Sequence, residues 1–154
     1  MSNEEIRVPV PLDDDGFLRR ECPACGREFK WFYSEDSEPV PTDGYACPYC
    51  AQTADADSWF TQAQIDVVHD AVGREIVDPM LDEFGREMRH ASRGSFVQVD
   101  VTSSPRPPRP QLTEPNDMTR VDPSCHPKEP IKVLENWTDT VHCIVCAAPI
   151  RDAA

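Results

Sequence analysis

The sequence predicts a small α+β protein in which two small β modules, each stapled by clustered cysteines, flank a helical segment. Two Cys-x-x-Cys pairs lie within the first fifty residues, and a third pair lies near the C-terminus. Between them, residues 57–92 repeat apolar side chains at helical spacing. The 154 residues include 16 prolines and only 39% hydrophobic residues, and modules with so little core usually need a metal or disulfides to fold.

The first fifteen residues are predicted to form a flexible acidic lead-in. They are polar and end in a run of three aspartates, which is typical of a solvated tail. A short strand then leads into the first cysteine pair, and residues 28–33 are rich in strand-forming side chains. Phe29 and Trp31 should share one face of this return strand, since side chains alternate along a strand.

The first module, residues 16–56, carries Cys-Pro-Ala-Cys-Gly, followed after 21 intervening residues by Cys-Pro-Tyr-Cys. A tight turn after the first cysteine of each pair brings the second sulfur onto the same metal, and Gly26 supplies the backbone freedom that such a turn needs. Two turns of this kind, facing each other, offer four thiolates in a tetrahedral array, which suits Zn²⁺. The predicted ligands of the first site are Cys22, Cys25, Cys47 and Cys50.

The helical segment is predicted over residues 57–94. Thr61 and Gln64 fit a capping box at its start. The helical spacing of apolar residues continues past Asp78-Pro79. The proline there predicts either a second helix from Pro79 or one helix kinked at that point. A stripe that faces the core is the expected role of such a face, and a stripe that binds a partner is the alternative.

A strand and a Pro-rich linker are predicted over residues 95–116. Apolar and polar residues alternate over 95–101, which favours a strand. Residues 103–115 contain five prolines, and this composition is typical of a polyproline-like spacer between modules. The same segment has Pro-x-x-Pro spacings beside arginine, a pattern that aromatic-lined grooves of other proteins bind.

The second module, residues 117–150, offers three cysteines and two candidate histidines. Neighbouring residues on a strand point to opposite faces, which counts against a histidine ligating beside its adjacent cysteine. Pro127, however, indicates a turn in which Cys125 and His126 could both reach one ion. The alternative to a metal is that Cys125 is a small buried hydrophobe and the final pair is structural or redox-labile. The predicted second site is Cys125, His126, Cys143 and Cys146, with His142 as the alternative fourth ligand.

The chain is expected to be cytoplasmic. Its first fifteen residues lack the apolar core of a secretory signal, and no run of residues is apolar enough to span a membrane. Thiols stay reduced in the cytosol, so paired cysteines there favour a metal over disulfides. The seven cysteines, an odd number, also fit poorly with a closed set of disulfides.

The two knuckle sequences, Cys-Pro-Ala-Cys-Gly and Cys-Pro-Tyr-Cys, resemble those of zinc-ribbon and rubredoxin-like proteins. The resemblance covers residues 16–50 and, more weakly, 117–150. It implies zinc-ribbon-like modules, and by analogy with rubredoxin it makes iron the alternative metal at the first site, since four thiolates do not select between the two metals by geometry. Ala51 and Ala147 stand where a knuckle often has glycine.

The sequence contains no constellation of catalytic residues, so an enzyme is not expected. It lacks a His-Glu-x-x-His motif, a nucleophile elbow and a Gly-rich phosphate loop. A site closed by four cysteines has no open position for a hydrolytic water. The predicted function is therefore a zinc-binding, non-enzymatic adaptor that binds a protein partner, while the oligomeric state stays open. The exposed aromatic residues proposed as contact points are Trp31, Tyr33, Trp59 and Trp137.

Two other functions remain as alternatives. Zinc ribbons are commonly used in nucleic-acid binding and transcription, although a net charge of -13 disfavours a phosphate backbone as partner. An iron-containing redox carrier of the rubredoxin type is the other alternative. The basic residues that would contact nucleic acid are Arg106, Arg109, Arg120, Lys128 and Lys132.

Overall fold

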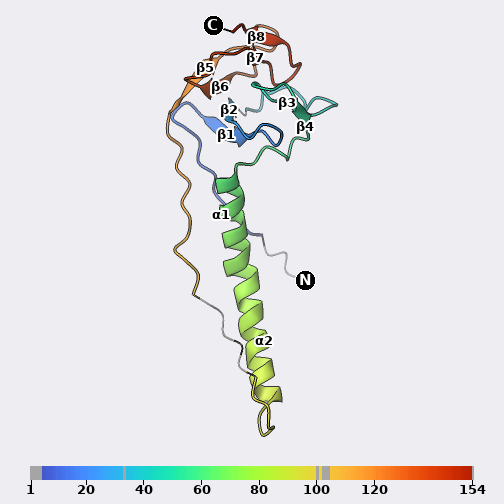
Figure 1. The fold of residues 1–154 in the computed structure, drawn as a ribbon, viewed down its shortest axis with the longest axis vertical. Coiled ribbons are helices and arrows are strands. Elements are labelled where there is room, and N and C mark those ends of the chain that lie inside the picture. The colour runs from blue at the N-terminus through green and yellow to red at the C-terminus, as the bar shows by residue number, and fades with distance from the viewer. Residues whose placement is uncertain (1–4, 33, 100, 102–104, 154) are drawn as a thin grey trace. The chain divides into compact units, whose positions relative to one another are not determined.

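The computed structural model describes residues 5–32, 34–99, 101 and 105–153. Figure 1 shows the path of the chain as a ribbon. Two compact units are present: a helical unit, made of Met1–Pro9 and Ala63–Leu112, and a sheet unit, made of Val10–Gln62 and Thr113–Ala154. Both predicted cysteine modules therefore belong to the sheet unit, and the helical segment separates its two halves in the sequence.

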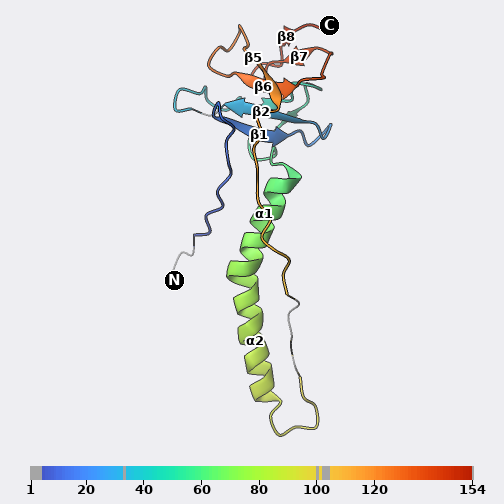
Figure 2. The same ribbon diagram turned by 90° about the vertical axis from the view of Figure 1, so that its left-hand side faces the viewer.

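A four-stranded antiparallel sheet forms the centre of the sheet unit, in the order β1-β2-β6-β5 (Figure 2). Strands β2 and β6 pair with Lys30 opposite Lys132 and Trp31 opposite Ile131. The expectation of two separate β modules is therefore wrong, because one sheet joins them. A two-stranded ribbon is marginally stable by itself, and joining two ribbons gives four strands a common apolar face. The strands are β1 (Phe17–Glu21), β2 (Glu28–Phe32), β5 (Met118–Val121) and β6 (Ile131–Leu134).

Two short hairpins complete the sheet unit, and each encloses a Cys-x-x-Cys pair. They are β3 (Tyr45–Ala46) with β4 (Thr53–Ala54), and β7 (Val141–His142) with β8 (Pro149–Arg151). The hairpins also bond to each other: the Ala46 amide donates to the Ile144 carbonyl at 2.8 Å, and the His142 amide donates to the Pro48 carbonyl at 2.9 Å. The two cysteine hairpins are thus coupled through their backbones. Strands β4 and β8 were not predicted from the sequence.

Both halves of the sheet unit share one hydrophobic core. Phe29 and Trp31 both lie in it, as their alternation along β2 predicted, and the Phe29 ring packs edge-on against Trp59 at 5.7 Å between centroids. Tyr49 links the halves: its hydroxyl donates to the Glu28 carbonyl at 2.7 Å and accepts the Leu134 amide at 2.9 Å. The core therefore depends on residues from before and after the helical segment.

Of the aromatic residues proposed as contact points, Trp31 and Trp59 are instead core residues. Trp59 has no exposed surface and Trp31 is 8% exposed, while Trp137 is half-buried and packs against Tyr49. Tyr33 lies outside the described residues. Large aromatic side chains supply much of the apolar area in a thin core, which explains why they are not left for a partner.

The acidic lead-in is not simply a solvated tail, because the side chain of Asp13 is fully buried and contacts two lysines of the four-stranded sheet, Lys30 and Lys132. Its Oδ2 lies 3.1 Å from Lys30 Nζ and 2.7 Å from Lys132 Nζ, and all three side chains are at least 98% buried. Like charges directly opposite each other on paired strands are destabilising. The Asp13 carboxylate therefore makes the pairing of β2 with β6 possible at the Lys30 and Lys132 position.

Other carboxylates surround the same two ammonium groups. Lys132 Nζ lies 2.6 Å from an Asp15 oxygen, and Lys30 Nζ lies 2.9 Å from an oxygen of Glu114. Burial alone would raise the pKa of Asp13, but hydrogen bonds from Lys132, from the Phe17 amide and from Lys30 outweigh it and hold that pKa well below its usual range. Asp13 is therefore ionised whenever the sheet unit is folded at neutral pH.

The helical unit contains one continuous helix, with no break at Asp78-Pro79. It consists of α1 (Gln62–Val72), a π-helical turn η1 (Gly73–Val77) and α2 (Asp78–Ala91). The Asp78 amide bonds to the Gly73 carbonyl, five residues back. Proline cannot donate the α-helical hydrogen bond, and the wider π-turn just before Pro79 is where the helix adjusts its bonding.

The Pro-rich segment lies along this helix within the helical unit. The Arg106 guanidinium is bonded to the Asp78 carboxylate at 2.6 and 2.9 Å, and Arg74 donates to the Pro107 carbonyl. A Cβ at Gly73 would lie 2.5 Å from the Arg106 guanidinium, so glycine leaves room for that contact. The segment predicted as a spacer is thus held against the helix.

The strand predicted over residues 95–101 is not formed by the described residues of that range, and Phe96 and Val97 are exposed. Alternation alone does not make a strand when no partner strand is present to satisfy its backbone. In the part of the chain that the structure describes, no helix combines the length and apolarity needed to cross a membrane.

Candidate metal centres

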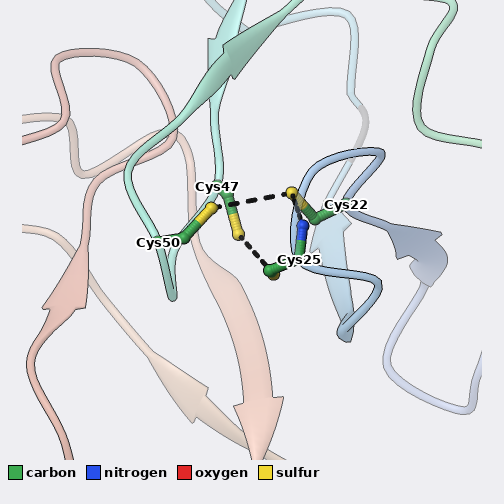
Figure 3. A group of neighbouring side chains, drawn as sticks. All are labelled: Cys22, Cys25, Cys47 and Cys50. Atoms are coloured by element: carbon green, nitrogen blue, oxygen red, sulfur yellow. Dashed lines mark hydrogen bonds between the residues drawn. The ribbon is translucent and has the colours of Figure 1, made fainter.

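The four N-terminal cysteines converge on one point, as Figure 3 shows. Cys22 Sγ lies 3.7 Å from Cys50 Sγ, and Cys25 Sγ lies 3.8 Å from Cys47 Sγ. All four sulfurs lie within 4.8 Å of one another. Zinc–sulfur bonds of about 2.3 Å in a tetrahedron place sulfurs about 3.8 Å apart. The spacing of this group therefore fits a single tetrahedral ion.

The same turn positions all three Cys-x-x-Cys pairs. In each, the amide of the residue after the second cysteine donates to the carbonyl of the first cysteine at 2.9 Å. That residue has a positive φ in every case: 73° at Gly26, and 61° at both Ala51 and Ala147. Glycine adopts this conformation freely, whereas alanine does so at a cost. The two alanines therefore leave the turn geometry intact and store local strain.

Replacing the two strained alanines by glycine should stabilise the metal-loaded sheet unit. A left-handed alanine costs about 1–2 kcal/mol, while glycine loses about 0.4–1 kcal/mol more entropy on folding. Ala51→Gly and Ala147→Gly should each raise the free energy of unfolding by about 0.5–1 kcal/mol. Denaturant titration with zinc in excess measures the change.

Gly26→Ala is the matched reverse substitution. No atom lies within 4 Å of the Cβ it would add, so only backbone strain changes. It should lower the free energy of unfolding by about the same amount. If all three variants unfolded at the wild-type denaturant midpoint, the strain argument would be wrong.

Backbone amides also orient the sulfurs. The Ala24 amide lies 3.3 Å from Cys22 Sγ, the Tyr49 amide 3.3 Å from Cys47 Sγ, and the Val145 amide 3.5 Å from Cys143 Sγ. An amide that donates to a sulfur favours its thiolate form. The turn therefore supplies both the position of each first cysteine and part of the charge compensation that a thiolate ligand needs.

The C-terminal group contains three cysteines and His126. Cys125 Sγ lies 3.6 Å from Cys146 Sγ, and Cys143 Sγ lies 3.5 Å from His126 Nδ1. A tetrahedral zinc bound by sulfur at about 2.3 Å and nitrogen at about 2.0–2.1 Å places such a pair about 3.6 Å apart. The structure brings together the four residues Cys125, His126, Cys143 and Cys146 within 4.8 Å, and this spacing also fits one ion.

His142 is not part of this group. Its Nδ1 lies 3.1 Å from the Ala147 carbonyl oxygen, in the hairpin formed by β7 and β8. His126 and Cys125 lie in an irregular segment just before the turn at Pro127, which lets two neighbouring side chains face the same point. The opposition of neighbours that a strand imposes does not apply there.

Glu38 is a residue of the second centre that sequence reasoning missed. Its Oε2 lies 3.4 Å from His126 Nε2, while Nδ1 of the same ring faces the cysteines. Histidines that bind metals usually donate their other ring N–H to such a carboxylate, which fixes the orientation of the ring. Glu38 belongs to the loop between β2 and β3, 88 residues before His126, and nothing in its local sequence marks it.

Glu38→Gln should weaken metal binding at the second centre by about 10–100-fold while leaving the first centre unchanged. The amide keeps the size of the side chain but removes the charge that orients and polarises His126. Competition with a chelator of known affinity measures both centres in one titration. Glu35→Gln, an exposed position in the same loop, is the control, and equal affinities in the two variants would contradict the assignment.

Burial keeps several of these thiols neutral in the absence of a cation. Desolvation raises the pKa of Cys47 above its usual range and raises that of Cys143 to about 12. Burial also opposes ionisation of Cys25 and Cys146, but backbone hydrogen bonds involving Arg27 and Ala148 outweigh it and lower their pKa. A bound divalent cation would draw the protons from the buried thiols, so metal binding should be coupled to proton release.

Comparison of the chain with protein families, curated proteins and solved structures finds no match. Each of the two groups can hold a metal ion. An ion bound by all four ligands of a group would have no coordination position left for water or substrate, which is the arrangement of structural sites.

Proposed function

We propose that this protein is a zinc-binding, non-enzymatic adaptor that acts by binding another protein. The observation that carries the adaptor role is a row of exposed apolar side chains on the long helix. We call this row the apolar stripe; it consists of Val68, Val72, Val77, Met80, Leu81 and Phe84. Exposed apolar patches on soluble proteins often mark interaction sites.

The π-turn keeps the stripe on one face of the helix. Residues three and four apart share a face of an α-helix, so Met80 and Phe84 lie on one face, as do Val68 and Val72. Val72 and Val77 are five residues apart, a spacing that would separate them in an α-helix. A π-turn bonds residues five apart and brings them into line. The irregularity before Pro79 therefore makes the stripe continuous.

Zinc is the metal that these ligands support best. Four thiolates, or three thiolates and an imidazole, at tetrahedral spacing are the ligand sets of structural zinc. In this role the ions would stabilise the sheet unit and take no part in a reaction. The zinc-ribbon resemblance of the knuckle sequences points the same way, and it would extend here to two knuckle hairpins that are coupled through their backbones.

Nucleic acid is disfavoured as the partner. Three of the five basic residues proposed to contact it are paired with carboxylates: Arg106 with Asp78, Arg120 with Asp122, and Lys132 with Asp13 and Asp15. Lys132 is also 98% buried. A net charge of -13 repels a phosphate backbone in addition.

A pull-down with matched variants tests the adaptor role. Immobilised, zinc-loaded protein should retain a partner protein from nuclease-treated extract, and the double variant Met80→Gln/Phe84→Gln should lose that partner. Glu83→Gln/Glu87→Gln changes exposed helix positions outside the stripe and should retain it. Equal retention by both variants, or a partner that is lost on nuclease treatment, would contradict the proposal.

A further inference from the structure

The sheet unit contains a mainly apolar cavity of about 360 Å³. Its walls include Leu18, Trp31, Val40, Tyr45 and Ile144, which come from both halves of the unit. Pockets that bind small molecules have volumes of about 300–1,000 Å³ and combine apolar walls with a few polar groups. The cavity therefore has the size and the lining of a site for a small ligand.

One arginine in this lining lacks an anionic partner. Arg20 has no carboxylate within ion-pair distance among the described residues, and its Nε is buried without a hydrogen-bond partner. Its guanidinium carbon lies 4.6 Å from the centre of the Trp31 ring and 5.0 Å from that of Phe60. Burial lowers the pKa of Arg20 to about 10, against its usual value above 12. An anion beside Arg20 would compensate for the lost hydration of its charge.

The neighbouring Arg19, in contrast to Arg20, is paired with carboxylates. On the same strand, Arg19 bonds to Glu28 at 2.8 Å, to Glu114 at 2.9 Å and to Asp117 at 2.6 Å. A highly acidic chain thus gives one arginine of β1 three carboxylates and leaves the next one among aromatic rings. Stacking orients the Arg20 guanidinium without neutralising its charge.

We propose that the cavity binds a small organic monocarboxylate, whose carboxylate pairs with Arg20 and whose apolar group lies against Trp31, Val40 and Ile144. Arginine and carboxylate form strong, charge-assisted hydrogen bonds in partly desolvated sites. Glu129, the other charged residue of the lining, already accepts the Glu38 amide at 2.6 Å. Its negative charge disfavours a second carboxylate on the ligand, which restricts the class to monocarboxylates.

Titration of the zinc-loaded full chain with 4-phenylbutyrate tests this site. In nuclear magnetic resonance spectra, the amide resonances of the cavity residues should shift. The neutral analogue, 4-phenylbutanol, should bind at least about tenfold more weakly than the acid. Arg20→Gln should remove this preference for the acid. Arg120→Gln is the matched control, because Arg120 also lies over an aromatic ring, that of Phe17 at 5.7 Å, but does not line the cavity.

The two analogues keep the proposal testable in the wild-type protein even if Arg20→Gln does not fold. Equal affinity of the acid and the alcohol would overturn the role of Arg20. Absence of shifts at about 10 mM of the acid, beyond the millimolar range of weak binding, would overturn the site itself. Shifts confined to residues outside the cavity, or an acid preference that survives Arg20→Gln, would also refute it.

Discussion

Removal of metal with a chelator should unfold the entire sheet unit. Cys22 and Cys47 belong to the shared core, and Cys47 and Cys143 have no exposed surface, so thiols without a cation would be left in an apolar interior. Binding of structural zinc contributes about 10–16 kcal/mol, which equals or exceeds the total stability of most domains, about 5–15 kcal/mol. Near-ultraviolet circular dichroism should therefore be lost, and it should return when zinc is added back.

Because both halves share one sheet, loss of one metal centre should affect both halves. Protein purified without added metal should contain two zinc ions and be colourless, whereas iron at the first centre would give a visible absorption band. Cys22→Ser should disturb amide resonances in β5 and β6 as well as in β1 and β2, because β2 pairs with β6. A chelated protein that kept dispersed resonances, or a Cys22→Ser change confined to the N-terminal strands, would contradict it.

Loss of the Asp13 charge should strongly destabilise the sheet unit, although Asp13 lies outside both metal centres. Asp13→Asn keeps an acceptor for the Phe17 amide but leaves Lys30 and Lys132 facing each other without the carboxylate between them. Removing one partner of a buried ion pair lowers the free energy of unfolding by about 3–5 kcal/mol. Denaturant titration of the zinc-loaded protein should show a loss of this size.

Asp14→Asn is the matched control, because Asp14 is the next residue and is exposed. It should change the free energy of unfolding by less than about 0.5 kcal/mol. Lys30→Met/Lys132→Met in the Asp13→Asn background should restore most of the stability, since apolar replacement of a buried charge cluster is often neutral or better. Equal effects of Asp13→Asn and Asp14→Asn would refute the role given to Asp13.

The pH dependence of this contribution has a definite sign. The pKa of Asp13 is lowered in the folded protein, so its carboxylate stabilises the fold fully above the unfolded value of about 4 and loses that effect only as pH falls below it. The difference in stability between wild type and Asp13→Asn should therefore be constant from neutral pH down to about 4. Any loss that begins above this pH should be common to both proteins and should accompany metal release.

The sequence alone determined the parts of this protein that depend on neighbours along the chain. The spacing of Cys22, Cys25, Cys47 and Cys50 predicted one ligand group, since each Cys-x-x-Cys turn is a local structure. The alternation around Phe29 and Trp31 and the helical spacing of apolar residues over 57–92 likewise predicted β2 and the long helix. These patterns predicted the two cysteine-rich groups that could hold metal ions and most of the elements, but not how the elements assemble.

Only the tertiary structure decided the contacts between distant residues. Asp13 meets Lys132 across 119 positions and Glu38 meets His126 across 88, and no local pattern encodes either pair. The sequence predicts a solvated acidic run at Asp13. Its two lysine partners come together beside it only when β2 pairs with β6, so the local sequence does not show that Asp13 is buried. That pairing joins two marginally stable ribbons into one sheet. The shared core and the buried charge cluster can form only when both halves are present.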